Sequence, residues 1–163
     1  MKNYLAISII TILLFGISCQ NKFEKEKTAI IKVIEESTSA YKARDSVRIN
    51  NVYLHDESTT RLFAGKYGFN YEKGWKEIAD FYKTSFDENP FAITTKYEKT
   101  NYVIKVYRKS ACVFHDEIIY DSENEYSHHQ IGVHFLEKIK GEWKIVYLSY
   151  IDTSSYEEET REE

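Results

Sequence analysis

The last apolar stretch of the chain, Glu142–Asp152, limits the fold most strongly, because apolar side chains occupy both of its faces. In an extended strand the side chains alternate between the two faces. One face carries Trp143, Ile145, Tyr147, Ser149 and Ile151, and the other carries Val146, Leu148 and Tyr150. An antiparallel strand of this kind must be covered on both sides. We therefore expect helices over one face and a second copy of the sheet over the other, with Val146, Leu148 and Tyr150 at the contact between copies.

The second half of the chain predicts an antiparallel meander of four strands. The segments rich in Thr, Tyr, Val and Ile are Phe91–Tyr107, Ala111–Tyr120, Tyr126–Ile139 and Glu142–Asp152. Polar turn residues separate them, and the turn at residues 140–141 is short enough for a tight hairpin. Since strands joined by short turns pair with each other, we expect these four to form one sheet.

The first half predicts three helices and one short strand. Apolar and small residues recur at helical spacing over Ile30–Tyr41, and Asp45 is a suitable N-cap for a second helix that reaches Leu54. The alternating segment Ser58–Ala64 predicts a short strand, and the glycines within Gly65–Gly74 predict a loop after it. A third helix follows, with an apolar face made of Trp75, Ile78, Ala79, Tyr82 and Phe86.

This order of elements resembles the nuclear transport factor 2-like superfamily, in its SnoaL-like branch, over residues 24–152. Ala40–Asp45 is similar to the end of the family's first helix, Lys73–Ile78 to the Gly-Trp start of its third helix, and Leu136–Tyr147 to its final hairpin. The resemblance implies an α+β cone-shaped barrel. Three N-terminal helices would pack in a strongly curved antiparallel sheet of one short strand plus a four-strand meander. Members include isomerases, cyclases, dehydratases and non-catalytic domains, so the fold alone does not fix the function.

The family's pocket lies at the wide end of the cone, and the resemblance places Asp45, His55 and Asp56 near its polar positions. On the second long strand, His115 and Glu117 share one face. His129 joins them if its side of the third strand faces inward. The candidate ligand-pocket residues are Asp45, His55, Asp56, Tyr67, Tyr71, Trp75, His115, Glu117 and His129.

Two interpretations of these polar residues remain open. An acid/base enzyme would need a carboxylate such as Glu117 or Asp56 beside a neutral donor such as Tyr67 or Tyr71. In the structural alternative Asp45 caps a helix, residues 55–57 form a polar loop, and Glu117 is a solvated residue at the rim.

The N-terminus resembles a bacterial lipoprotein signal. Lys2 precedes the apolar run Tyr4–Ile17, and Ser18 and Cys19 follow it. The resemblance implies removal of residues 1–18, a lipid on Cys19, a short tether over residues 19–23, and anchoring to a membrane of the bacterial cell envelope after export. The alternative is an ordinary secretory signal with an incidental cysteine. At the other end, residues 153–163 predict an acidic flexible tail.

Composition and spacing argue against several functional classes. The formal net charge of −4 gives no sign of a basic stripe, so no nucleic acid is expected. His115, His128, His129 and His134 lack the His-x-His spacing of a metal site on one strand, and His128 and His134, which share a face, are six residues apart, so we expect no metal site. The glycines lack the spacing of a phosphate-binding loop, and no cofactor is expected.

Three functions remain in view from the sequence. The first is a lipid-anchored, homodimeric domain that binds an unidentified small ligand without catalysis. The second is a small isomerase, dehydratase or hydrolase that uses a pocket carboxylate or histidine. The third is a structural module for dimerisation or partner docking. The side chains that line the cone distinguish the three.

If Cys19 carries the lipid, Cys19→Ala should leave the membrane fraction or retain its signal peptide. A single acyl chain is marginal at about 0.8 kcal/mol per buried methylene, so at least two chains are expected on the anchored form. Detergent partitioning of both proteins checks this, and Cys112→Ala is the matched control because it removes the other cysteine. Unchanged partitioning of Cys19→Ala would contradict the anchor.

Overall fold

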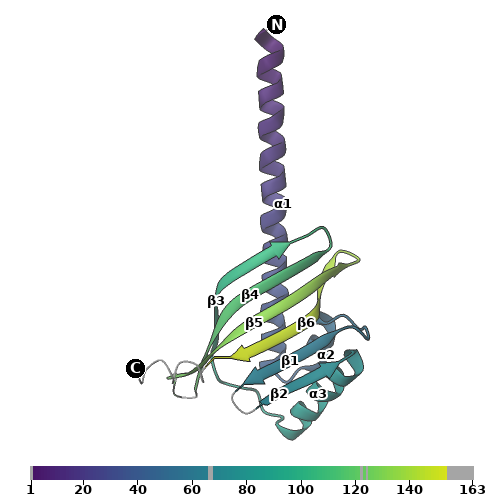
Figure 1. The fold of residues 1–163 in the computed structure, drawn as a ribbon, viewed down its shortest axis with the longest axis vertical. Helices are drawn as coiled ribbons and strands as arrows, with labels where there is room; N and C mark the ends of the chain where they lie inside the picture. Colours follow the sequence, from purple (N-terminus) through teal and green to yellow (C-terminus); the bar gives the residue numbers. More distant parts are fainter. Residues whose placement is uncertain (1, 66–67, 122, 124, 154–163) are drawn as a thin grey trace.

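A long N-terminal helix, two shorter helices and six strands make up the described part of the chain in the computed structural model (Figure 1). The structure describes the backbone of residues 2–65, 68–121, 123 and 125–153, and the side chains of these residues except 2–21 and 126. The helices are α1 (Lys2–Lys42), α2 (Ser46–Val52) and α3 (Trp75–Glu88). The strands are β1 (Thr60–Gly65), β2 (Gly68–Lys73), β3 (Tyr97–Val106), β4 (Ser110–Tyr120), β5 (Tyr126–Ile139) and β6 (Glu142–Asp152).

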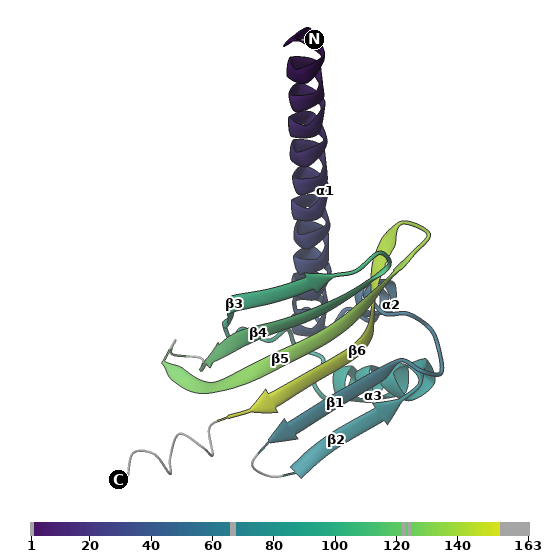
Figure 2. The same ribbon diagram turned by 45° about the horizontal axis from the view of Figure 1, so that its top comes forward.

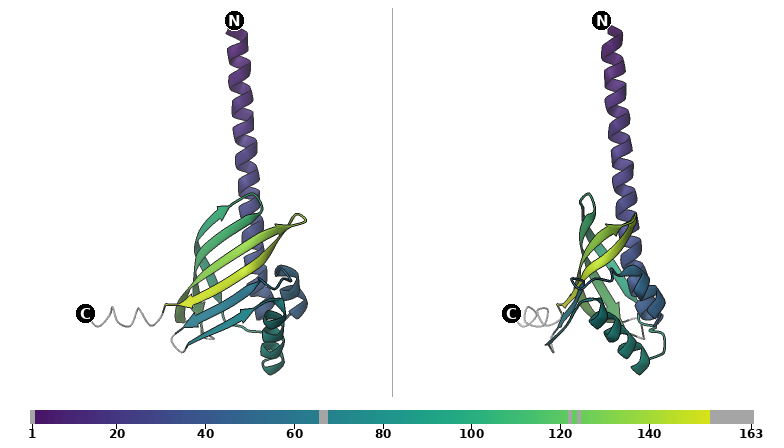
Figure 3. Two further views of the ribbon diagram at one scale, coloured as in Figure 1. Left: turned by 45° about the vertical axis from the view of Figure 1, so that its right-hand side comes forward. Right: turned by 90° about the vertical axis from the view of Figure 1, so that its right-hand side faces the viewer.

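All six strands form one curved sheet in the order β2-β1-β6-β5-β4-β3 (Figure 2). Seen along the edge of the sheet, the helices lie on one side of it (Figure 3). The predicted α+β class is confirmed, with two differences in detail. The segment predicted as a loop after β1 forms β2, and β1 pairs in parallel with β6, so the sheet is mixed. The side chains of β2 are mostly exposed. Its strand structure therefore depends on its pairing with β1 and not on burial of an apolar face.

The first long strand begins at Tyr97 and not at Phe91 as predicted. Residues 91–96 instead run past the end of α1, where the Ile93 amide donates a hydrogen bond to the Lys42 carbonyl at 2.8 Å. Lys42 is the last residue of α1, so this bond satisfies one of the carbonyls that a helix end leaves without a partner.

A β-bulge in β6 overturns the expected assignment of its two faces. Phe135 pairs with Tyr147 while Leu136 pairs with Ile145, so Val146 is an extra residue on β6. Beyond the bulge the alternation changes phase. Leu148 therefore follows Ile145 on the concave face, and the sheet surface away from the helices carries Tyr147 instead. The predicted contact surface with Val146, Leu148 and Tyr150 was wrong, because regular alternation cannot anticipate an inserted residue.

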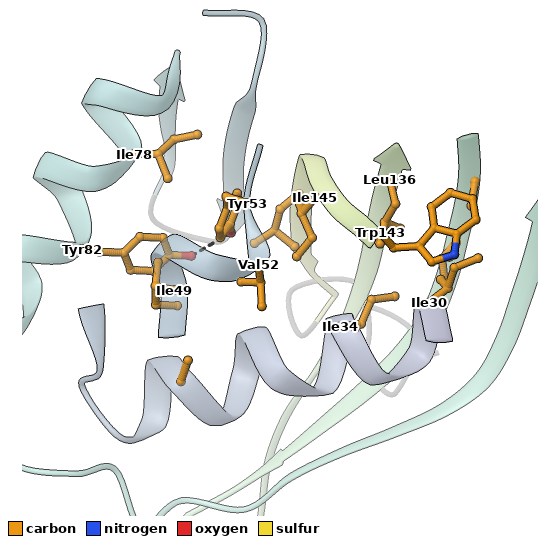
Figure 4. Close-up of a cluster of buried hydrophobic side chains, with 14 of the residues drawn as sticks. Ile30, Ile34, Ile49, Val52, Tyr53, Ile78, Tyr82, Leu136, Trp143 and Ile145 are labelled. Atoms are coloured by element: carbon orange, nitrogen blue, oxygen red, sulfur yellow. Dashed lines mark hydrogen bonds between the residues drawn. The ribbon is translucent and has the colours of Figure 1, made fainter. Parts of the chain in front are cut away.

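The core forms where the buried stripe of α1 meets the concave face of the sheet (Figure 4). Ile30, Ile34, Ile78, Leu136 and Ile145 are completely buried there. The α2–α3 side of the core is more polar, and the hydroxyl groups of Tyr53 and Tyr82 lie 2.9 Å apart within it (Figure 4). Burial raises the pKa of both tyrosines, so both hydroxyls are neutral at ordinary pH.

Helix α1 extends well beyond the sheet toward the N-terminus (Figure 1). It runs as one helix through residues 2–23, which cover most of the predicted signal peptide and the predicted tether. Within the part of the chain whose side chains are described, no helix is long and apolar enough to cross a membrane. Most of the predicted acidic tail, residues 154–163, lies outside the described residues.

Candidate functional site

A cavity of about 230 Å³ lies between α1 and the concave face of the sheet. It begins where the buried side chains of α1 change from large to small. Ile30 and Ile34 pack fully into the core, whereas Ser37 and Thr38, one turn further on, line the cavity. Since these side chains are short, they leave space opposite Leu148 and the neighbouring strands.

Four tyrosines from four elements supply much of the cavity wall: Tyr41 of α1, Tyr82 of α3, Tyr97 of β3 and Tyr150 of β6. Burial raises the pKa of Tyr97 to about 12. Burial, followed by the negative charge of Glu117, raises the pKa of Tyr150 well above its usual range. The hydroxyls of Tyr97 and Tyr150 therefore remain neutral at ordinary pH and can donate or accept hydrogen bonds. The wall combines flat apolar rings with a few polar tips, which suits a small organic molecule.

A row of three polar residues crosses the concave face in register. Lys99 of β3 pairs with Glu117 of β4, and Glu117 pairs with Gln130 of β5. The Gln130 amide donates a hydrogen bond to Glu117 Oε2. Lys99 Nζ lies 3.0 Å from Glu117 Oε1, an ion pair whose angles fall outside hydrogen-bond geometry. Glu117 and Gln130 line the cavity, and the side chains of Lys99 and Glu117 are each only 1% exposed.

Arg61 of β1 brings a second charge to the cavity wall. Its guanidinium donates a hydrogen bond to Glu72 of β2 at 2.8 Å, and both side chains are 14% exposed. The guanidinium also lies over the ring of Phe81, 3.8 Å from its centroid. Arg61 is thus held from two sides, and its charge is balanced before any ligand arrives.

Two buried histidines lie on the same concave face as the polar row. His115 Nε2 and His134 Nε2 are 3.0 Å apart, and His115 Nδ1 lies 3.2 Å from the Asp116 carbonyl oxygen. Because a carbonyl can only accept, His115 Nδ1 carries a hydrogen, and His134 Nε2 donates to His115 Nε2. His134 Nδ1 is then a bare acceptor, and it has no hydrogen-bond partner among the described residues. Gly132 is required opposite this pair, since a Cβ there would lie 2.3 Å from His115 Nε2.

Of the residues predicted for the pocket, Glu117 lines the cavity and His115 lies on the same concave face. Asp45 is the N-cap of α2, where its carboxylate accepts hydrogen bonds from the amides of Val47 and Arg48 at 3.0 Å each. This arrangement is the structural alternative that the sequence left open for Asp45. The rim alternative for Glu117 does not hold, because Glu117 is 1% exposed.

The other predicted residues lie away from the cavity. His55 stacks on the Trp75 ring at 4.3 Å and, with Asp56, borders a shallow surface recess. Tyr71 is half exposed on β2. His129 lies on the outer face of β5, where its Nε2 is 3.3 Å from Asp116, so the expected inward orientation does not occur. Tyr67 lies outside the described residues.

Sequence reasoning missed Lys99, Arg61, Gln130 and the four tyrosines of the cavity wall. A bulge in β3 hides Lys99, because two residues, Asn101 and Tyr102, stand opposite the single residue His115 between the paired positions. Lys99 and Tyr102 consequently both face inward despite their odd spacing. Arg61 depends on the pairing of β1 with β6, which no local pattern reports. The abundance of tyrosine, 14 in the chain, was the one available signal.

Within the described residues, no group of three or more His, Cys, Asp or Glu side chains converges so as to hold a metal ion. The polar groups in or beside the cavity wall are the tyrosine hydroxyls, the Glu117–Gln130–Lys99 row, the paired Arg61, and the side chains of Ser37, Thr38 and His128.

No family model matches the sequence, and no curated protein matches it. Solved structures share its fold. A protein of unknown function with a cystatin-like fold from Nostoc punctiforme aligns with a TM-score of 0.62 and 16% identity, over 79% of this chain and 92% of that chain. A nuclear transport factor 2-like superfamily protein from Salmonella enterica aligns at 0.61 with 20% identity, over 78% and 91%. An NTF2-like protein with a cystatin-like fold from Novosphingobium aromaticivorans aligns at 0.64 with 11% identity, over 85% and 88%. The chain has the nuclear transport factor 2-like fold. At these identities the likeness concerns the fold alone.

The two buried histidines should make stability depend on pH. Burial lowers the pKa of His115, and burial together with the charges of His115 and Lys99 lowers the pKa of His134 well below its usual range. Below about pH 6.5 the unfolded chain binds protons that the folded chain excludes, so the free energy of unfolding falls as pH falls. The slope can reach about 1.4 kcal/mol per pH unit for each histidine, and above about pH 6.5 the stabilisation is complete.

Urea unfolding between about pH 5.5 and 7.5 measures this slope, and His134→Gln should reduce it. The control is Ile145→Val, a fully buried position that cannot titrate. It should lower the free energy of unfolding by about 1 kcal/mol at every pH without changing the slope. A wild-type stability that is flat across this range would contradict the assignment of two neutral buried histidines.

Proposed function

We propose that this domain binds a small organic molecule in the cavity between α1 and the sheet, as a non-catalytic domain of SnoaL-like type. The observation that carries the proposal is the mixed wall of the cavity. Four tyrosine rings supply apolar area, while Glu117, Gln130 and the tyrosine hydroxyls supply a few fixed polar groups. Such a combination is typical of ligand sites. An open cavity of about 230 Å³ also argues against the purely structural module, which would need a filled cone.

A second candidate is a small enzyme, and the buried carboxylate of Glu117 in the cavity wall favours it. A general base must be free to take a proton from the substrate. Here Gln130 donates to one oxygen, and the ammonium of Lys99 lies against the other. A substrate proton would have to compete with both neighbours for the carboxylate. We therefore prefer binding without turnover.

We also propose that Cys19 carries a lipid and anchors the domain to a membrane of the bacterial cell envelope. The support is the N-terminal sequence, with its single lysine, short apolar run and Ser18-Cys19 junction. The long α1 leads from this segment directly into the domain, so an anchor at Cys19 would hold the cavity close to the membrane surface (Figure 1).

The outer face of the sheet is the proposed contact between two copies of the chain. Its exposed apolar side chains include Val103, Phe114, Phe135 and Ile151, and they span four adjacent strands. Phe135 also packs edge-on against Tyr147. Exposed apolar side chains on adjacent antiparallel strands favour cover, and a symmetric pair would bury them on both copies at once.

Filling the cavity should abolish ligand binding without unfolding the domain. Ser37→Met places a longer, flexible side chain into the cavity from α1. Thr28→Met, at an exposed position of the same helix, is the matched control. Thermal unfolding with a panel of neutral bicyclic compounds checks this. Saturable stabilisation should occur in the wild type and in Thr28→Met but not in Ser37→Met. Equal stabilisation in all three proteins would contradict binding in the cavity, and consumption of a compound by the wild type would favour the enzyme.

A charge on the outer face should separate the dimer. Phe114→Asp places a carboxylate in the apolar surface, where burial without a partner is costly. Light scattering on the chain from residue 22 onward should report a dimer for the wild type and a monomer for this variant. Phe91→Asp is the control, because Phe91 is 85% exposed and lies between α3 and β3, outside the strands. A monomeric wild type at high concentration would refute the proposed dimer.

A further inference from the structure

The carboxylate of Glu117 has acceptor capacity that the described residues do not use. An ionised carboxylate offers about four lone-pair sites. The Gln130 amide takes one of them at Oε2. Oε1 is buried and accepts no hydrogen bond from any described residue, although Lys99 lies 3.0 Å away. The Lys99 ammonium balances the charge of Oε1 but leaves it without a hydrogen bond of good geometry, so a ligand hydroxyl that donates to this oxygen would complete its bonding.

The charges around the cavity favour a donor that is itself neutral. The side chain of Lys99 is as deeply buried as Glu117 and balances its charge. Glu35 lies 3.5 Å from Lys99 on the other side, but it is half exposed and therefore screened by water. On the opposite wall Arg61 is already paired with Glu72. A ligand ammonium would be attracted by Glu117 but repelled by Lys99 beside it. A ligand carboxylate would be repelled by Glu117 itself. Neither charged group therefore gains a net electrostatic attraction that would offset its loss of hydration.

The size of the cavity sets the size of the ligand. A protein cavity of about 150 Å³ lined by apolar side chains holds one benzene molecule. The cavity here, about 230 Å³, is half as large again. Its tyrosine walls present flat rings to whatever lies between them. These dimensions fit a flat bicyclic body with one small polar group.

We propose that the ligand is a neutral alcohol or phenol of bicyclic size whose hydroxyl group donates a hydrogen bond to Glu117. This inference rests on the proposed function, since it names the chemical class that the binding cavity accepts. Gln130, which already holds Oε2, fixes the carboxylate so that Oε1 remains available. The tyrosine hydroxyls are neutral and can donate to the lone pairs of the ligand oxygen.

Three probe ligands of similar shape test the inference on the purified full chain. They are 2-naphthol, which donates a hydrogen bond, 2-methoxynaphthalene, which does not, and 2-naphthoate, which is anionic. Equilibrium dialysis gives the free and bound concentrations, and the cavity-filled Ser37→Met protein measures binding outside the cavity. We expect 2-naphthol to bind about tenfold more tightly than the ether, as a hydrogen bond to a charged acceptor implies, and 2-naphthoate to bind most weakly.

The variant Glu117→Gln should reduce this preference from about tenfold to about threefold, because a neutral amide oxygen accepts a weaker hydrogen bond than a carboxylate. If loss of the ion pair unfolds it, the double variant Glu117→Gln with Lys99→Met removes both buried charges together. Glu35→Gln is the matched control, because it changes the half-exposed neighbour of Lys99 and should keep the full preference.

The outcomes separate the inference from the proposed function. Equal binding of 2-naphthol and the ether to the wild type would overturn the hydroxyl donor while leaving a ligand-binding cavity. Tightest binding of 2-naphthoate would overturn the neutral ligand in the same way. No binding of any probe beyond that of Ser37→Met would overturn the inference and count against the cavity as a ligand site. A preference that keeps its full size in Glu117→Gln would remove Glu117 from the recognition.

Discussion

The packing of α1 against the concave face of the sheet is the constraint on which the cavity depends. Ile30 and Ile34 of this helix are completely buried and belong to the same core as Leu136 and Ile145. Glu26, one turn earlier, accepts hydrogen bonds from Lys138 and from the Trp143 indole, which tie the helix to the β5–β6 hairpin. With this end fixed, the helix cannot move toward the sheet at Ser37 and Thr38. The gap left by their short side chains therefore persists as a cavity.

Much of the architecture could be predicted because its signals are local. Asp45 as an N-cap, the apolar face of α3 and the turn at residues 140–141 each depend on neighbours in the sequence, and all are present. What failed depends on pairing between distant segments. The bulge at Val146 changes the phase of β6, and β2 exists because β1 lies beside it. A pattern of period two carries no information about either event.

The candidate site was harder to predict for the same reason. Glu117 could be chosen because it shares a strand face with His115, and it does line the cavity. Its two partners, Lys99 and Gln130, are brought beside it by the register of β3, β4 and β5. A bulge after Thr100 shifts the register of β3. His55 and Trp75 illustrate the opposite error, since they do lie together but on the surface. The types of residue in the sequence indicated which side chains could take part in binding or catalysis. The pairing of the strands, which the sequence does not report, determines which of them line the same cavity.

The polar groups on the concave face are not what stabilises the fold. Burying an ion pair such as Lys99–Glu117 gives up the hydration of two charges, and apolar side chains of similar volume are often at least as stable. The neighbouring histidines pair with each other and leave one ring nitrogen without a donor. The fold is stabilised instead by apolar side chains such as Ile30, Ile34 and Leu136, which are completely buried. These polar groups lower the stability of the fold, and they lie beside the cavity. Packing alone does not require a buried carboxylate at Glu117, so its presence there argues for a role in ligand recognition.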